Sequence, residues 1–297
     1  MLFAKKSAAE KRAAFRAALA SGNLQRFPGV FSPLVAMLIE EQGFDGVYIS
    51  GAVLANELGL PDIGLTTMTE IASRGRQIAR VTELPAIIDI DTGFGEPMNV
   101  ARTVQELEEM GLSGCHIEDQ VNPKRCGHLD HKIIVERQEM VRKLRAAADA
   151  RRDANFVVIA RTDAREPEGL PAAIDRAKAY VDAGADMIFP EALAEESEFA
   201  AMRKAVKVPL LANMTEFGRT PLMDAKRIEA LGFNLVIYPV TALRLAMKAI
   251  EDGYAALKRD GTQAGIVNRM QTRKRLYELL RYEEYGAFDK DVFNFKV

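Results

Sequence analysis

The chain of 297 residues contains no tryptophan, three histidines and only two cysteines, Cys115 and Cys126. Two cysteines are too few for a disulfide framework, so the composition is typical of a reducing compartment, and we expect a cytoplasmic protein. No apolar run is as long as a transmembrane helix, because charges such as Arg244 and Lys248 interrupt the most apolar segments. The formal net charge of -2 favours neither nucleic acid nor an anionic membrane as a partner.

Residues 1–22 are rich in alanine and in basic side chains, a composition that transit peptides share. However, Glu10 interrupts the basic character, and Phe15 and Leu19 have the i, i+4 spacing of one helical face. The pair Ser21-Gly22 then resembles a helix stop. We therefore expect an ordinary first helix rather than a targeting segment.

Short apolar runs rich in β-branched residues alternate with helical patterns along the chain. The expected strands are 27–31, 46–50, 86–90, 114–118, 156–161, 187–191, 209–213 and 235–238, and the helices between them include 99–110, 136–148, 170–183 and 221–231. Because parallel strands need crossover helices, these strand–helix units predict an α/β fold, a (β/α)8 TIM-type barrel. A doubly wound open sheet is the alternative.

No linker rich in proline, glycine or serine divides the sequence, so it predicts one barrel domain over residues 1–297. The tail from about residue 263 to 297 follows the eighth strand–helix unit and carries apolar residues such as Met270, Leu276 and Tyr277. We expect this tail to be a C-terminal helical extension of the same domain that covers the barrel or a partner subunit.

Polar side chains stand where most of the expected strands end, and the catalytic groups of a barrel lie at the carboxyl ends of its strands. A single such residue is more often a helix cap or part of a solvated turn. Their coincidence on six strands indicates one functional face. These residues are Tyr48, Ser50, Asp89, Asp91, His116, Glu118, Arg161, Asp163, Glu191, Asn213 and Thr215.

Asp89 and Asp91 are two residues apart at a strand end, so both carboxylates can face one hard cation. Oxygen ligands favour Mg²⁺ or Mn²⁺ over zinc, and Glu118 could complete the set directly or through water. The alternative is a pair of helix caps, but Asp89 lies inside the expected strand. A zinc site is also conceivable, since both cysteines and all three histidines fall between residues 115 and 131. It is disfavoured because neighbouring Cys115 and His116 point to opposite faces of a strand.

The stretch Lys124-Arg125-Cys126-Gly127-His128 places a thiol between cations and next to a glycine. Neighbouring positive charge stabilises a thiolate, which suits a cysteine that transfers a proton. A charged surface loop with an incidental cysteine is the alternative.

These residues resemble the isocitrate lyase/phosphoenolpyruvate mutase superfamily, and within it the 2-methylisocitrate lyases of the methylcitrate cycle. The resemblance covers nearly the whole chain and rests on the following segments: the 124–128 loop, His116-Ile117-Glu118-Asp119-Gln120, Gly59-Leu60-Pro61-Asp62, Ala160-Arg161-Thr162-Asp163-Ala164, Phe189-Pro190-Glu191-Ala192 and Asn213-Met214-Thr215-Glu216-Phe217-Gly218. Isocitrate lyases generally have Lys in place of Arg125 and are much longer. One departure is Ala52, where the family commonly has a glycine.

The resemblance implies a carbon–carbon lyase of propionate catabolism that cleaves (2R,3S)-2-methylisocitrate to pyruvate and succinate. It implies Mg²⁺ at Asp89 and Asp91, with Asp62 and Glu118 in support, and a homotetramer of dimers that swap their last helices. The implied substrate contacts are Ser50, Gly51, Ala52, Lys124, Cys126, Gly127, Arg161, Glu191, Asn213, Thr215, Arg244 and Arg273.

Cleavage of this kind needs a deprotonated tertiary alcohol and leaves an enediolate-like dianion on the succinate half, which cations and hydrogen-bond donors must stabilise. We expect Arg161, His128, Asn213 and Arg244 in that role, and Glu118 beside the metal. Cys126 would donate the proton to the carbanion, on a loop that closes over the substrate. Tyr48, ionised by the surrounding positive charge, is the expected base. Two alternatives are a lyase for isocitrate or another 2-hydroxy acid and a non-catalytic scaffold that binds a dicarboxylate.

Overall fold

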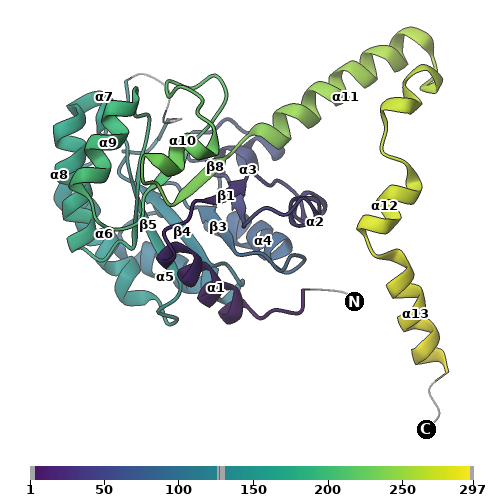
Figure 1. Cartoon of the computed structure of the whole chain (residues 1–297), viewed down its shortest axis with the longest axis horizontal. Coiled ribbons are helices and arrows are strands. Elements are labelled where there is room, and N and C mark those ends of the chain that lie inside the picture. Colours follow the sequence, from purple (N-terminus) through teal and green to yellow (C-terminus); the bar gives the residue numbers. More distant parts are fainter. Residues whose placement is uncertain (1–3, 126, 128–130, 295–297) are drawn as a thin grey trace.

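Eight parallel strands follow one another around the molecule in a computed structural model that describes residues 4–125, 127 and 131–294 (Figure 1). The strands are β1 Gln25–Pro28, β2 Val47–Ile49, β3 Ala86–Asp89, β4 Gly114–Glu118, β5 Val157–Thr162, β6 Met187–Pro190, β7 Leu211–Asn213 and β8 Leu235–Tyr238. They form two sheets, β2-β3-β4-β5-β6 and β1-β8-β7. Isolated parallel bridges, Gly29 with Tyr48 and Ile188 with Leu210, link the two sheets. The predicted (β/α)8 TIM-type barrel is therefore confirmed.

Helices cover the outside of the strands. They are α1 Ala8–Ala20, α2 Pro33–Glu41, α3 Gly51–Glu57, α4 Met68–Ala79, α5 Pro97–Glu109, α6 Arg137–Ala150, α7 Arg165–Glu168, α8 Leu170–Asp182, α9 Glu196–Ala205, α10 Ala225–Ala230 and α11 Thr241–Asp260. Several predicted boundaries are wrong by one to four residues, and two of them have a clear local cause. The first strand begins at Gln25, because its N–H bonds Asn234 O. Helix α10 begins at Ala225 and not at residue 221, because the Asp224 side chain caps it by accepting from Arg227 N at 2.9 Å.

Side chains alternate between two apolar cores, as the pleat of a strand requires. On β4, Cys115 is buried in the core between the strands and the helices, whereas His116 points inward and stacks on Tyr48. This confirms that the two neighbours face opposite sides. Burial also raises the pKa of the Cys115 thiol, so this cysteine is an inert core residue.

Helix α1 closes the barrel at the amino ends of the strands. Ser7 and Glu10 form a capping box at its start, and Ser21 ends it before Gly22, whose φ is 78°. Phe15 is 1% exposed and packs against Phe27 of β1 with ring centroids 5.2 Å apart. The expected first helix is thus confirmed as part of the core.

The chain beyond β8 leaves the barrel as an arm of helices, which we call the C-terminal arm. Helix α11 leads outward, and η1 Ala264–Arg269, α12 Arg273–Leu279 and α13 Tyr282–Phe293 turn back past the side of the barrel (Figure 1). Arg275 on α12 pairs with Glu41 on α2 at 2.7 Å. Among the described helices, α11 included, none is long and apolar enough to cross a membrane.

Replacing Phe15 by Ala should lower the free energy of unfolding by about 3–5 kcal/mol, because a buried aromatic ring is lost and a cavity remains. Urea denaturation measures this change. The matched control is Phe217→Ala, because Phe217 is 94% exposed, and it should stay within about 0.5 kcal/mol of the parent. Equal losses in the two variants would show that α1 does not close the core.

Candidate active site

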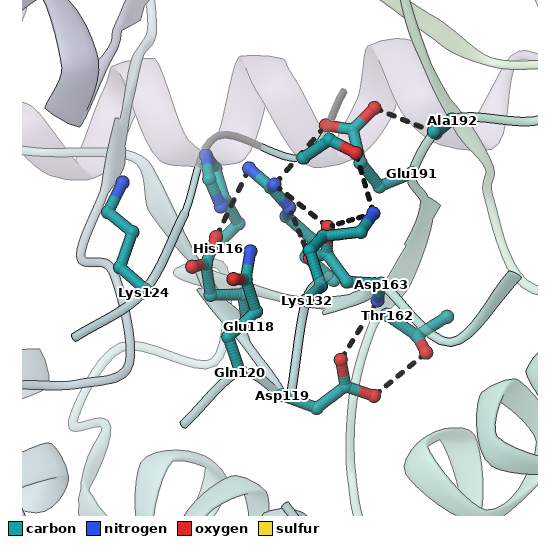
Figure 2. A network of polar contacts seen from close by, with 12 residues as sticks. His116, Glu118, Asp119, Gln120, Lys124, Lys132, Thr162, Asp163, Glu191 and Ala192 are labelled. Carbon is teal, nitrogen blue, oxygen red and sulfur yellow. Dashed lines mark hydrogen bonds and ion pairs between the residues drawn. The ribbon is translucent and has the colours of Figure 1, made fainter. Parts of the chain in front are cut away.

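One guanidinium connects the carboxyl ends of three strands. The Arg161 side chain on β5 places Nη1 3.2 Å from Glu118 Oε2 at the end of β4, and Nη2 3.4 Å from Glu191 Oε2 after β6. Its Nε donates to Asp163 Oδ2 at 2.9 Å, and its Nη2 donates to Asp163 Oδ1 at 3.2 Å. Figure 2 shows Glu118, Asp163 and Glu191 around this centre. The sequence predicted that side chains from separate strands would meet at this end of the barrel, and they do.

Arg161 and its three carboxylate partners are all at least nine-tenths buried. Because water screens these charges little, the charge of each group affects the pKa of the others. Burial lowers the pKa of Arg161, but Asp163 and Glu118 raise it more, so the guanidinium stays charged. Burial raises the pKa of Glu118 well above its ordinary value, against the opposing charge of Arg161. Glu118 Oε2 is held by its ion pair with Arg161, and neither oxygen makes a further hydrogen bond to a described residue. Oε1 is therefore the oxygen that is available to water, a metal shell or a ligand.

The paired aspartates face one point at the same end of the barrel. Asp89 Oδ1 accepts from Asp91 N at 2.9 Å, and Asp89 Oδ2 accepts from Gly51 N at 3.2 Å. A Cβ atom on Gly51 would lie 3.0 Å from Asp89 Oδ2 and 3.1 Å from Asp91 Oδ1, so the two oxygens converge beside Gly51. The cap of α5 is Glu96 and not either aspartate. The alternative of paired helix caps is therefore wrong.

Lys124 joins Asp91 to a third carboxylate, that of Asp62. Its Nζ is 2.8 Å from Asp91 Oδ1 and also bonds Asp62, and the residue is 3% exposed. Burial and the charge of Asp89 raise the pKa of Asp91 to about 6, although Lys124 opposes the shift. Within the described part of the chain, no three His, Cys, Asp or Glu side chains are grouped as metal ligands. Two converging carboxylates still fit Mg²⁺, which keeps several waters and takes one or two carboxylates from the protein.

Tyr48 and His116 form a buried pair below the aspartates, with Tyr48 Oη 2.8 Å from His116 Nε2. Burial lowers the pKa of His116 to about 4, so the ring is neutral near pH 7. Burial, reinforced by the charge of Asp89, raises the pKa of Tyr48 well above its ordinary value. This shift opposes the ionised Tyr48 that we expected, because burial and the charge of Asp89 outweigh the opposing charge of Arg161. The role of Tyr48 as the base stays a prediction.

Of the other predicted contacts that the structure describes, all but Arg273 lie around this centre. Ser50 caps α3 at the end of β2, with Gly51 and Ala52 next to it, and Asn213 Nδ2 donates to Glu191 Oε2 at 3.2 Å. Arg244 on α11 lies 3.5 Å from Thr215 Oγ1 but pairs mainly with Glu216 at 2.6 Å. Arg273 begins α12 in the C-terminal arm, and no contact joins it to the described residues of this centre. Cys126 and His128 fall outside the described residues.

The loop next to Cys126 reaches the arginine cluster. A Cβ atom on Gly127 would lie 2.4 Å from both Arg161 Nη2 and Glu191 Cγ, so only glycine fits here. Lys132 Nζ donates to Gly127 O at 2.6 Å and pairs with Asp163 Oδ1 at 3.1 Å.

Sequence reasoning missed Lys132 and the support beneath the cluster. Asp119 accepts from Thr162 Oγ1 at 2.8 Å, from Tyr180 Oη at 2.7 Å and from Asp163 N at 2.9 Å, as Figure 2 shows in part. Arg176 then bonds Tyr180 Oη at 3.2 Å. Arg176 and Tyr180 are four apart on the buried face of α8, and a charge on that face was the one signal in the sequence. Lys132 gave none.

Comparison with known proteins places the fold and site in one family. The family model described as phosphoenolpyruvate phosphomutase matches residues 15–258. The chain therefore belongs to the phosphoenolpyruvate mutase/isocitrate lyase family, and the resemblance read from its motifs is confirmed. It is 61% identical, over 96% of its length and 94% of the relative's, to a Corynebacterium glutamicum protein named "Probable 2-methylisocitrate lyase 1".

Two solved structures agree with this placement. A crystal structure of 2,3-dimethylmalate lyase superimposes with a TM-score of 0.90 at 33% identity and covers 99% of each chain. Phosphonopyruvate hydrolase in complex with oxalate and Mg²⁺ superimposes with a TM-score of 0.86 at 35% identity, over 94% of this chain and 98% of the other.

Replacing Arg161 by Met should lower the free energy of unfolding by about 3–5 kcal/mol, because buried Glu118, Asp163 and Glu191 would lose their shared cation. Urea denaturation gives the value. The control Arg152→Met breaks a surface pair with Glu109, whose side chains are 63% and 57% exposed, and should cost less than about 1 kcal/mol. Similar losses in both variants would contradict a central role of Arg161 in the charge balance.

Proposed function

We propose that the protein is a metal-dependent carbon–carbon lyase that cleaves (2R,3S)-2-methylisocitrate to pyruvate and succinate. The relative named as a 2-methylisocitrate lyase supports this substrate, because it is 61% identical over nearly the whole of both chains. The observation that carries the proposal is the meeting of Arg161, the paired aspartates and the Gly127 end of the cysteine loop at one barrel end. The reaction belongs to the methylcitrate cycle of propionate catabolism, in the cytoplasm.

Asp89 and Asp91 are the residues that would hold Mg²⁺, with Asp62 and Glu118 in support, and Mn²⁺ could replace it. The related barrel of phosphonopyruvate hydrolase is in complex with Mg²⁺ and oxalate, an oxyanion ligand. A bound divalent cation lowers the pKa of a coordinated hydroxyl and stabilises the negative charge that develops on oxygen. Lys124, which pairs with Asp62 and Asp91, keeps the excess of carboxylates balanced around that cation.

The remaining residues bind substrate and move protons. Ser50 and the start of α3 face the aspartates and would orient the pyruvate end, with Gly51 and Ala52 next to them. Arg161 and Asn213 would stabilise the dianion of the succinate half as it forms, because charge-assisted donors act most strongly in a buried site. Further contacts are Lys124, Gly127, Glu191, Thr215, Arg244 and His128, and Arg273 would come from a second copy of the chain.

Cys126 would protonate the new carbanion. The loop that carries it is basic in sequence, and its described neighbour Gly127 packs against Arg161 and Glu191. Tyr48 would be the base that removes the hydroxyl proton, although burial raises the pKa of its phenol and so opposes the ionised form.

A coupled assay for pyruvate release tests the function directly. The parent protein should release pyruvate from 2-methylisocitrate, and Cys126→Ser should lower kcat about a hundredfold or more while the fold is kept, because a positioned acid contributes about that much. Cys115→Ala is the control, because Cys115 lies in the outer core, and it should keep most of the activity. Absence of pyruvate from the parent would refute the proposal, and full activity in Cys126→Ser would remove the cysteine from the mechanism.

The same assay separates the two lyase alternatives. The value of kcat/KM should be higher for 2-methylisocitrate than for isocitrate by about 10- to 200-fold, the range that one methyl group gives in an apolar pocket. A preference for isocitrate would favour the alternative substrate instead.

Chelation tests the metal proposal. Dialysis against EDTA should abolish pyruvate release, and Mg²⁺ or Mn²⁺ should restore it, because the paired carboxylates would lose their cation. Asp91→Asn should raise the Mg²⁺ concentration needed for half-maximal activity, whereas Asp224→Asn, which alters a distant helix cap, should leave it unchanged. Activity that is indifferent to chelator would contradict the metal role of Asp89 and Asp91.

We also propose a homotetramer of dimers that swap their last helices. The C-terminal arm exposes many large apolar side chains, which a free chain would not keep in water. They include Leu245, Met247, Ile250, Tyr254, Met270, Tyr282, Tyr285 and Phe288. Light scattering after size exclusion should give four times the chain mass of 32.8 kDa, and Leu245→Asp with Tyr254→Asp should give smaller species. A monomeric parent would contradict this assembly.

A further inference from the structure

The loop between β4 and α6 is held by two buried side chains that the motifs do not assign. The loop is closed at its base, where Val121 N donates to Ile133 O at 2.8 Å and Val135 N donates to Asp119 O at 2.8 Å. Gln120 and Lys132 lie at this base, and their side chains reach into the loop. They contact the peptide groups of Arg125 and Gly127, the residues on either side of Cys126 in the sequence.

The side-chain amide of Gln120 makes hydrogen bonds with both the N–H and the C=O of Arg125. Its Oε1 accepts from Arg125 N at 2.9 Å, and its Nε2 donates to Arg125 O at 2.8 Å. Gln120 is 2% exposed, so the glutamine side chain reaches the exposed residue Arg125 from the buried base of the loop. A glutamine amide carries one acceptor and one donor group at its end, and it therefore matches the N–H and the C=O of a single residue.

Lys132 ties the other side of the loop to the arginine cluster. Its side chain is fully buried, and Nζ donates to Gly127 O at 2.6 Å and pairs with Asp163 Oδ1 at 3.1 Å. Asp163 in turn holds the Nε and Nη2 atoms of Arg161. The position of Gly127 is thus linked to the orientation of Arg161 through one ammonium and one carboxylate, which Figure 2 shows from Lys132 to Asp163.

We propose that Gln120 and Lys132 are positioning residues that act as a two-point clamp, fixing the peptide groups of Arg125 and Gly127 against the Arg161 cluster. This inference deepens the proposed function, on which its kinetic part rests. A buried side chain that only filled space would not satisfy both peptide atoms of one residue or bridge a loop carbonyl to Asp163. The clamp predicts that its loss disturbs turnover more than substrate binding, because a displacement of about 1 Å at a reacting group can cost on the order of a hundredfold in rate.

Hydrogen exchange tests the clamp without reference to activity. In Gln120→Leu, exchange at the Arg125 amide should become at least about tenfold faster, since its acceptor is lost, while the Val121 amide stays protected by Ile133 O. Gln120→Glu should give a smaller change, because the carboxylate still accepts from Arg125 N but cannot donate to Arg125 O. If Gln120→Leu does not fold, the exchange rate of the Arg125 amide is measured in Gln120→Glu instead. Unchanged exchange at Arg125 in these variants overturns the clamp.

Kinetics test whether the clamp positions the reaction. Gln120→Leu and Lys132→Met should lower kcat by about 10- to 100-fold with KM changed by less than about threefold, and Lys132→Arg should recover part of kcat because it keeps the charge and the donors. Matched controls are Gln105→Leu, whose amide bonds Ala150 O, and Lys11→Met, whose buried ammonium bonds Ala79 O beneath the barrel.

The two sets of measurements separate the possible failures. Faster exchange at Arg125 with kcat equal to that of the controls would overturn the positioning role, as would equal losses of kcat in Lys132→Met and Lys11→Met. A parent protein that releases no pyruvate would refute the proposed function, and the exchange result would then decide the clamp by itself.

Discussion

The structure depends on one buried cation shared among three strands. Arg161 faces Glu118, Asp163 and Glu191 within 3.4 Å, and no single one of these carboxylates could be buried there without it. Because each partner comes from a different strand end or the turn after it, the ion pairs also fix how the strand ends are placed relative to one another. So many carboxylates can be buried at this barrel end because the guanidinium, with the ammonium groups of Lys124 and Lys132, balances their charge.

Inward-facing side chains differ in kind between the two ends of the barrel strands. Inward residues at the amino ends are aromatic or aliphatic and pack on α1, whereas inward residues at the carboxyl ends are charged. Asp119, Thr162 and Tyr180 connect the charged layer to α8 through hydrogen bonds, so the centre rests on a satisfied polar network rather than on apolar packing alone. Such pre-organisation is what electrostatic stabilisation of a developing anion requires.

The sequence predicted much of the fold and of the candidate site, and the features that it did not predict depend on three-dimensional contacts. Strand positions followed from apolar runs, and the paired aspartates followed from their spacing within β3. The raised pKa of Tyr48 could not be predicted, because its causes, burial and the nearby charge of Asp89, arise only in three dimensions. Lys132 gave no periodic signal, since its role depends on Asp163 from the next strand. Arg273 lies in the C-terminal arm at the start of α12, and its predicted contact with substrate stays a prediction.

A crystal structure with Mn²⁺ and pyruvate would test the central claim most directly, because anomalous scattering locates the metal without reference to activity. The account predicts a single strong peak at the barrel end, at about 2 Å from a carboxylate oxygen of Asp89 or Asp91 or from a water that they hold. It also predicts pyruvate between that ion and Ser50, with Cys126 close enough to reach a substrate at the same end. A metal bound elsewhere, with Asp91 still paired with Lys124 and Asp89 still bonded to the backbone of Gly51, would contradict it.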